Sequence, residues 1–392
     1  MSLRFIYGRS GSGKTHFCLD ELKTKIISEE QTPFVLLVPE QYSFQAERDL
    51  IAMLKTGGIL KTEVLSFQRL AFRVFNEAGG ITYPHIHPAG KNMLLYRILD
   101  KMKGKLKVFT RSAEQPGFVG TLSTLITEFK RYNVTPEKLD TVVQNMNEES
   151  PLKEKLTELK GIYQTFDELI HLRYRDPDDD LTLAAQKLKT SLQYRGAEIW
   201  IDGFTDFTPQ EYSIIQELLH QAKRVTITLT TDALDSETSE MDLFSSAKKA
   251  YQKLLFLARQ DNIAYEPPVR LHQNPLHRFR HSPELFHLEQ NLNAHPYRVY
   301  PEQTTQISLF SNVNIVTEIE SAATDILRLC RDEGFRFRDI AVVTRNLKAY
   351  EKLIEVIFAE YGIPCFLDRK LDIMGHPLVR LILSMLEIFI EN

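Results

Sequence analysis

An α/β fold built on a parallel sheet is predicted by three features of this 392-residue chain. Continuous apolar runs, typical of strands that are buried on both faces, occur at residues 34–38, 197–201 and 225–229. Helical patterns separate these runs, and this alternation is typical of a parallel sheet with helices on both faces. A glycine-rich stretch, GRSGSGKT, lies between a predicted strand at residues 4–7 and a predicted helix at residues 15–27.

The remaining elements of the first sheet follow from local patterns. In the helix predicted at residues 15–27, Phe17, Leu22 and Ile26 recur on one face. The short apolar run at 63–65 predicts a further strand, and an amphipathic pattern predicts a helix directly after it, at 67–75. These elements alternate as strand and helix, so they fit one parallel sheet.

The rest of the chain divides by its pattern. We predict a first α/β domain from residues 1–88 and 196–266, with an inserted helical subdomain at 89–195, where strand patterns disappear. Residues 267–305 show little periodicity and are predicted to be a connecting segment; their histidines fit no zinc-site spacing. Residues 306–392 are predicted to begin a second α/β domain that is truncated, with strands at 307–310, 340–343 and 362–367.

Composition limits the class of protein. A hydrophobic content of 43% and a charged content of 26% are those of an ordinary globular protein. The net charge of −4 means that any nucleic-acid surface must be local. Cys18, Cys330 and Cys365 lie far apart, which disfavours a metal site built from this chain alone and favours a reducing, cytoplasmic location. No apolar run is long enough to span a membrane.

The final stretch, LVRLILSMLEIFIEN, is strongly apolar in a helical pattern. Because proteins seldom leave so much apolar surface uncovered, we expect the chain to be a piece of a longer protein. A terminal helix that docks onto the body of the protein is the alternative.

The glycine-rich stretch matches the pattern G-x-x-x-x-G-K-[ST] at every fixed position. Backbone N–H groups of such a loop bind phosphates, the lysine reaches the β- and γ-phosphates, and the hydroxyl holds Mg²⁺. We therefore expect ATP with Mg²⁺ to bind here, and the predicted nucleotide-binding residues of the loop are Gly8, Arg9, Ser10, Gly11, Ser12, Gly13, Lys14 and Thr15.

A carboxylate at a neighbouring strand end completes such a magnesium site. Asp202, which closes AEIWID, is the predicted partner of Thr15 and a Walker B-like carboxylate. The next residue is Gly203 rather than a second carboxylate that could position water, so the sequence favours nucleotide binding over rapid hydrolysis and no catalytic residue is assigned with certainty. Whether the chain is an enzyme is left open.

Aromatic and basic side chains follow the strand ends, where ligands of open parallel sheets bind. In the helix predicted at 67–75, the core face contains Phe67, Leu70, Ala71, Val74 and Phe75. Phe72 is left on the outer face between Arg69 and Arg73, an arrangement that suits stacking on bases and contact with phosphates of single-stranded DNA. An ordinary surface phenylalanine with solvated arginines is the alternative.

In this order the segments resemble superfamily 1 DNA helicases of the UvrD kind. A closer resemblance is to the AddB (RexB) family, and it rests on VPEQYSFQAE, VLSFQRLAFRVF, TEFKRY, IDGFTDFTPQE and GIPCFLD. The resemblance implies a RecA-like first domain, the start of a second RecA-like domain, and a nucleotide contact from Arg345 in IAVVTRN. The Asp202-Gly203 pair and the strand VTITLTTD depart from an active helicase in the way that this family does.

The family resemblance also implies a function. AddB proteins pair with an AddA-like helicase–nuclease subunit, act in double-strand break repair by homologous recombination, and are thought to grip the passing strand and recognise the Chi sequence rather than act as a motor. Their iron–sulfur cluster belongs to a C-terminal nuclease domain that this chain lacks. The positions implied in DNA recognition are Gln41, Ser43, Phe67, Arg69, Phe72 and Phe207, to which the helix pattern adds Arg73. A catalytically active superfamily 1 helicase and a P-loop small-molecule kinase are the alternatives.

Overall fold

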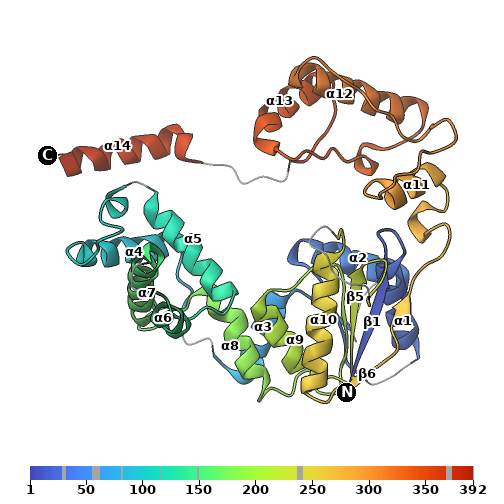
Figure 1. The fold of residues 1–392 in the computed structure, drawn as a ribbon. Helices are drawn as coiled ribbons and strands as arrows, with labels where there is room; N and C mark the ends of the chain where they lie inside the picture. The colour runs from blue at the N-terminus through green and yellow to red at the C-terminus, as the bar shows by residue number, and fades with distance from the viewer. Residues whose placement is uncertain are drawn as a thin grey trace. The chain divides into compact units, whose positions relative to one another are not determined.

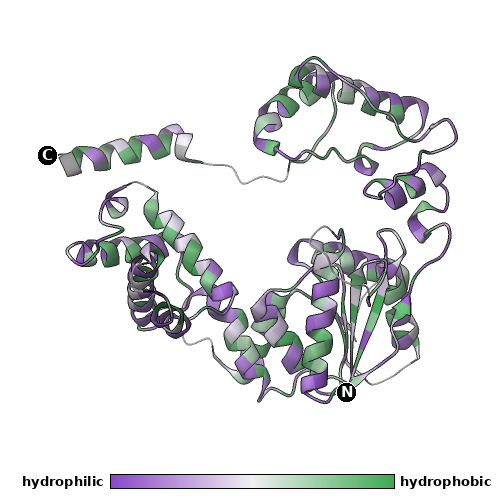
Figure 2. Ribbon diagram, viewed as in Figure 1, coloured by the Kyte–Doolittle hydropathy of each residue, from purple (hydrophilic) through white to green (hydrophobic). Residues whose placement is uncertain are grey.

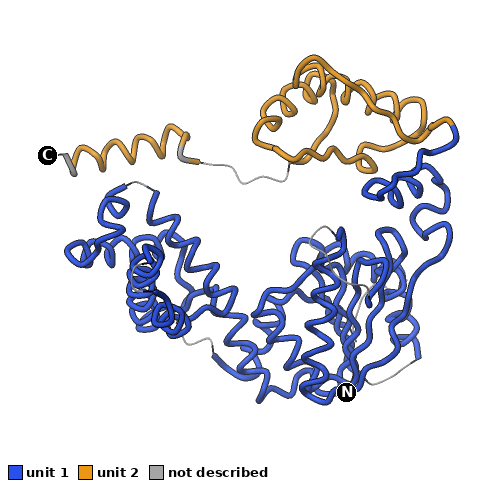
Figure 3. Tube along the Cα trace, viewed as in Figure 1, with its two compact units in different colours: residues 1–302 blue, residues 303–392 orange. Residues whose placement is uncertain are grey.

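The computed structural model describes residues 1–28, 32–54, 62–80, 83–115, 117–147, 150–235, 242–367 and 373–391. The chain forms two compact units, residues 1–302 and residues 303–392, which are described separately (Figure 3).

The first unit contains a parallel sheet of seven strands, so the predicted α/β fold is confirmed (Figure 1). The strand order is β3-β2-β4-β5-β1-β6, and β7 also pairs with β1. The strands are β1 (Ser2–Gly8), β2 (Phe34–Leu37), β3 (Thr62–Leu65), β4 (Glu198–Ile201), β5 (Arg224–Thr230), β6 (Ala264–Tyr265) and β7 (Val269–Arg270). Leu37 is in register with Ile201, and Gly8 with Thr230, so the carboxyl ends of the central strands meet at one edge.

Helices cover both faces of this sheet because its side chains alternate between two hydrophobic cores. Phe5 points into one core, together with side chains of α3, α8, α9 and α10, and Ile6 points into the other, together with those of α1 and α2. Figure 2 shows the strands as largely hydrophobic and the outer faces of these helices as largely hydrophilic. The helices are α1 (Lys14–Ile27), α2 (Ser43–Leu54), α3 (Phe67–Ala78), α8 (Asp180–Leu188), α9 (Pro209–Leu219) and α10 (Ser245–Gln260).

Four helices between α3 and α8 gather around a hydrophobic core of their own, which runs in sequence from Ile86 to Ile170. They are α4 (Pro88–Met102), α5 (Phe118–Arg131), α6 (Pro136–Gln144) and α7 (Pro151–Ile170). The next helix, α8, packs instead in the core of the sheet through Ala184, Ala185 and Leu188. The helical stretch predicted at 89–195 therefore includes one helix that covers the sheet.

The connecting segment predicted at 267–305 contributes to the first unit. It supplies β7, the short helix η4 (His277–Phe279) and α11 (Pro283–Asn291). Sequence patterns missed β6 and β7 because two-residue strands carry no measurable periodicity.

The second unit contains α12 (Ile315–Asp332), α13 (Leu347–Glu360) and α14 (Pro377–Glu391). The strands expected at 307–310, 340–343 and 362–367 do not form: these residues have no strand assignment in the described chain. A strand requires a hydrogen-bonded neighbour, and the described part of this unit provides none. No described helix combines the length and apolar character needed to cross a membrane.

Candidate functional site

The glycine-rich loop, Gly8–Thr15, joins the end of β1 to the start of α1 at the carboxyl edge of the sheet. Gly11 and Gly13 have φ angles of 78° and 92°, a left-handed conformation that glycine adopts without strain. These turns bring the loop around to the amino end of α1, where backbone N–H groups and the helix dipole favour an anion.

Lys14, Thr15 and Asp202 meet beside this loop, as the sequence predicts. The Lys14 ammonium donates to the carbonyl oxygens of Gly8 and Arg9, at 2.9 and 3.0 Å. The Thr15 hydroxyl donates to Asp202 Oδ2 at 2.6 Å, and Thr228 donates to Oδ1 at 2.5 Å. The buried Asp202 carboxylate therefore lies where it can share a cation with the Thr15 hydroxyl.

Burial lowers the pKa of Lys14 to about 8, and the charge of Asp202 partly opposes this shift. A lysine that is held by two carbonyl oxygens and half-deprotonated near pH 8 gains from a bound anion, because a phosphate stabilises its charged form.

A cavity of about 510 Å³ lies over the loop. Its walls include Ser10, Gly11, Gly13, Lys14, Thr15, Tyr42, Asp202, Thr228, His277 and Arg278. Backbone donors, a lysine, an arginine, hydroxyls and one carboxylate make this donor set suitable for a Mg²⁺-bound phosphate chain. Gly8 lies at the end of β1 and Ser12 is buried, so these two support the loop from behind.

The side chain of Arg9 is engaged away from this cavity. Its Nε lies 3.0 Å from Glu289 Oε1, its Nη2 donates to the Glu289 carbonyl at 2.7 Å, and its guanidinium lies over the ring of Phe244. Arg9 therefore anchors α11 against the loop. The prediction of Arg9 as a nucleotide contact can apply to its backbone only.

Sequence analysis missed the short helix η4, which closes one side of this cavity. The Arg278 N–H donates to the Gly11 carbonyl at 2.9 Å, and the His277 ring lies 4.8 Å from that of His16. Its segment lacks periodicity and carries no motif, so only the pairing of β7 with β1 brings it to the loop.

The carboxylates that follow Asp202 are committed to local structure. Asp206 accepts hydrogen bonds from its neighbour's N–H at 2.7 Å and from the Tyr212 hydroxyl at 3.0 Å. Glu211 forms a capping box with Thr208 at the start of α9. Among the described residues lining the cavity, Asp202 is the carboxylate available to a metal.

The amphipathic character of α3 is confirmed. Ser66 caps the helix by accepting a hydrogen bond from the Arg69 N–H at 3.2 Å. The predicted core face is buried, and it comprises Phe67, Leu70, Ala71, Val74 and Phe75. Phe72 is 56% exposed on the opposite face.

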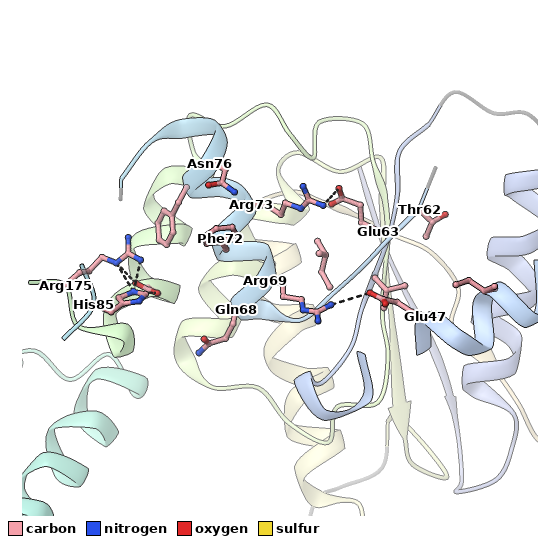
Figure 4. Close-up of a pocket in the computed structure, with 15 residues that line it drawn as sticks. Glu47, Thr62, Glu63, Gln68, Arg69, Phe72, Arg73, Asn76, His85 and Arg175 are labelled. Carbon is pink, nitrogen blue, oxygen red and sulfur yellow. Dashed lines mark hydrogen bonds and ion pairs between the residues drawn. The ribbon is translucent and has the colours of Figure 1, made fainter. Parts of the chain in front are cut away.

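Phe72 lines a cavity of about 870 Å³, here called the Phe72 pocket (Figure 4). Its walls come from α2, β3, α3 and the chain around residues 85 and 175, and they comprise Glu47, Ile51, Thr62, Glu63, Val64, Leu65, Gln68, Arg69, Phe72, Arg73, Phe75, Asn76, His85, Arg175 and Asp180. Arg69 Nη1 lies 3.3 Å from a Glu47 oxygen, and Arg73 Nη2 lies 3.2 Å from a Glu63 oxygen. Both guanidinium groups are about half exposed, so they can exchange these carboxylates for phosphates.

A smaller cavity of about 240 Å³ shares Gln68 with the Phe72 pocket and continues toward the start of α9. Arg131, from α5, and Gln210 line it. The two cavities together give α3 a polar, partly aromatic flank that runs along most of its length.

Four other residues predicted to contact DNA have different surroundings. Gln41 is exposed in the short helix η1 (Glu40–Tyr42), and the adjacent Ser43 is buried, with its hydroxyl donating to the Glu40 carbonyl at 2.9 Å. Phe67 and Phe207 are only 4% and 5% exposed and contact each other and Phe204 edge-on or tilted. As placed, neither ring is open to a base, so their direct stacking is corrected to a supporting role beneath the surface.

Arg345 belongs to the second unit, where it is exposed immediately before α13. The cysteines do not gather into a cluster among the described residues: Cys18 is buried beneath the sheet of the first unit, and the other two lie in the second.

A parallel sheet covered on both faces, with a glycine-rich loop between its central strand and the next helix, defines a RecA-like α/β protein. Comparison with known families is more specific. Residues 5–289 match the family model described as "ADDB, N-terminal", and the chain belongs to this family.

Named relatives agree with this assignment. The chain is 65% identical over 392 residues to the B subunit of the ATP-dependent helicase/deoxyribonuclease of Acetivibrio thermocellus. It is 54% identical to the protein of the same name in Ruminiclostridium cellulolyticum and 47% identical to that of Thermoanaerobacter pseudethanolicus. Each match covers 100% of this chain and 34% of the relative, so the chain spans about a third of the length of these proteins.

Proposed function

We propose that this chain is the strand-binding and nucleotide-binding part of an AddB-type subunit of an ATP-dependent helicase/deoxyribonuclease. The names of the relatives support a two-subunit enzyme, in which an AddA-like helicase–nuclease is the partner. In this proposal the chain grips single-stranded DNA, recognises Chi during double-strand break repair by homologous recombination in the cytoplasm, and is not the motor.

One observation carries the proposal of strand binding: Phe72 is exposed between two arginines on the wall of the largest described cavity of the first unit. An exposed ring offers a face on which any base can stack, and flanking guanidinium groups contact the backbone phosphates. Figure 4 shows Phe72 on α3 between Arg69 and Arg73. Gln68 and Asn76, on the same helix, add amide groups that can hydrogen-bond base edges.

The glycine-rich loop supports Mg²⁺–ATP binding within the same unit. Lys14 would contact the β- and γ-phosphates, and Thr15 and Asp202 would hold the metal, which supplies charge neutralisation to the phosphates. Because Asp206 and Glu211 are committed to local hydrogen bonds, the arrangement supports holding the nucleotide rather than hydrolysing it rapidly. The same observation weighs against an active helicase, and the strand-binding flank of α3 weighs against a small-molecule kinase.

Fluorescence anisotropy with labelled single-stranded oligonucleotides tests the proposal. Phe72→Ala should weaken binding by about 1–3 kcal/mol, the usual worth of one aromatic stacking contact. Phe256→Ala is the matched control, since Phe256 is 65% exposed on α10 and lines none of the described cavities considered above.

The control variant should bind as the unchanged chain does. Equal affinity of both variants would remove Phe72 from the site. Failure of the unchanged chain to bind any oligonucleotide, with or without a Chi-like sequence, would refute strand binding by this chain.

A further inference from the structure

His85 and Arg175 lie where the chain leaves the sheet domain for the helices α4 to α7 and where it returns. The two residues form an isolated parallel bridge. The Ile86 N–H donates to the Arg175 carbonyl at 2.9 Å, and the Arg175 N–H donates to the Pro84 carbonyl at 3.0 Å. Both side chains line the Phe72 pocket, so this junction forms one of its walls (Figure 4).

The side chains of the junction are held firmly. The Arg175 guanidinium lies 4.9 Å from the centre of the Phe75 ring, and its Nε is 2.9 Å from Asp180 Oδ1. His85 Nε2 lies 3.0 Å from Arg175 Nε and 2.9 Å from Asp180 Oδ2. The side chains of Arg175 and Asp180 are only 9% and 13% exposed, whereas that of His85 is 43% exposed.

The fixed charges of the pocket cancel. Its walls contain three arginines, Arg69, Arg73 and Arg175, and three carboxylates, Glu47, Glu63 and Asp180. Each guanidinium lies within 3.3 Å of one of these carboxylate oxygens. A neutral pocket gives a strand of phosphates no net attraction, so the charge of one more group decides its sign.

Histidine is the side chain that ordinarily changes charge close to neutral pH, and His85 is the histidine on the walls of this pocket. The charged groups in contact with it are Arg175 and Asp180. The next acidic group along the chain, Asp176, is engaged by Lys91 and Lys130, each at 3.1 Å.

We propose that His85 is a phosphate-contacting residue of the strand-binding site and that its protonation gives the Phe72 pocket the positive charge that holds a nucleic-acid backbone. This inference rests on the proposed function and adds to it a residue and a pH dependence. In its neutral form the imidazole accepts a hydrogen bond from Arg175 through Nε2. In its charged form it donates through Nε2 to Asp180, and its Nδ1–H becomes a donor for a phosphate oxygen.

The test measures binding of a fluorescein-labelled oligothymidylate between pH 6 and pH 8 for the unchanged chain and for His85→Asn. Asparagine keeps a hydrogen-bonding side chain and cannot become charged. His220→Asn is the matched control, because His220 is also 43% exposed and is also paired with a carboxylate, Asp261, at 3.1 Å, but lies outside the Phe72 pocket.

The unchanged chain and His220→Asn should bind about tenfold more tightly at pH 6 than at pH 8, as expected for one charge-assisted contact. His85→Asn should lose most of this dependence. At pH 6 it should also show a salt dependence that is shallower by about 0.7 in log–log slope, the loss of one phosphate contact on a single strand.

Two results would overturn the inference separately from the proposed function. If His85→Asn binds with the same pH dependence and salt slope as the unchanged chain, His85 contacts no phosphate, although strand binding stands. If His85→Asn and Phe72→Ala both bind as the unchanged chain does, the strand does not occupy the Phe72 pocket at all, and both proposals fail.

Discussion

Replacing Lys130 by methionine tests what joins the helices α4 to α7 to the sheet domain. The Lys130 side chain is only 2% exposed, and its ammonium lies 3.1 Å from Asp176, 2.6 Å from Asp179 and 3.4 Å from Asp167. Lys91 contacts Asp176 and Asp178 in the same cluster, and both ammonium groups lie over the ring of Phe166. These carboxylates raise the pKa of Lys130 despite its burial, so its charge persists through the accessible pH range.

The magnitude follows from what the substitution leaves behind. Methionine has a similar length and no charge, so Asp176 and Asp179 remain buried with one cation fewer between them. Removing one partner of a buried ion pair costs about 3–5 kcal/mol. Lys103→Met is the matched control, because Lys103 pairs with Glu114 at 2.9 Å with both side chains 56% exposed; we expect no measurable effect.

Urea unfolding separates the two effects. Far-UV circular dichroism follows the helices, and the fluorescence of Trp200, the single tryptophan of the chain, follows the core of the sheet. Lys130→Met should unfold at a lower urea concentration, and the loss should appear first in the helical signal. A midpoint equal to that of Lys103→Met would refute the reasoning, since it would mean that the buried carboxylates do not need the ammonium.

Two further predictions concern residues on either side of the candidate site. The affinity for Mg²⁺–ATP, measured by calorimetry, should fall as the pH rises from 7 to 9, because Lys14 has its pKa lowered to about 8 and loses its charge above that pH; a flat profile would show that Lys14 does not meet the phosphates. Phe67→Ala should lower the free energy of unfolding by about 3–5 kcal/mol, because it empties a buried aromatic site beneath α3. An unchanged melting temperature with weakened DNA binding would instead make Phe67 a direct contact.

Much of the sheet domain was predictable because its signals are local. The buried face of α3 follows from helical periodicity, and the meeting of Thr15 with Asp202 follows from the common edge at which parallel strands end. The exposure of Phe72 and the burial of its neighbours on α3 required only the spacing of apolar residues.

The features that escaped prediction depend on contacts between distant residues. His85 and Arg175 are ninety positions apart and meet only because the inserted helices begin and end at one place. The helix η4 covers the glycine-rich loop through the pairing of a two-residue strand. A family resemblance carried Phe207 into the predicted site, but resemblance conveys position in a motif and not exposure, and the ring is buried.

The central claim is that a single DNA strand lies along the exposed face of α3, and photocrosslinking tests it most directly. An oligonucleotide containing 5-iododeoxyuridine would be irradiated with the chain, and the crosslinked peptides identified by mass spectrometry. The account predicts crosslinks to Phe72 that disappear in Phe72→Ala and persist in Phe256→Ala. Crosslinks confined to other elements, unchanged in Phe72→Ala, would contradict it.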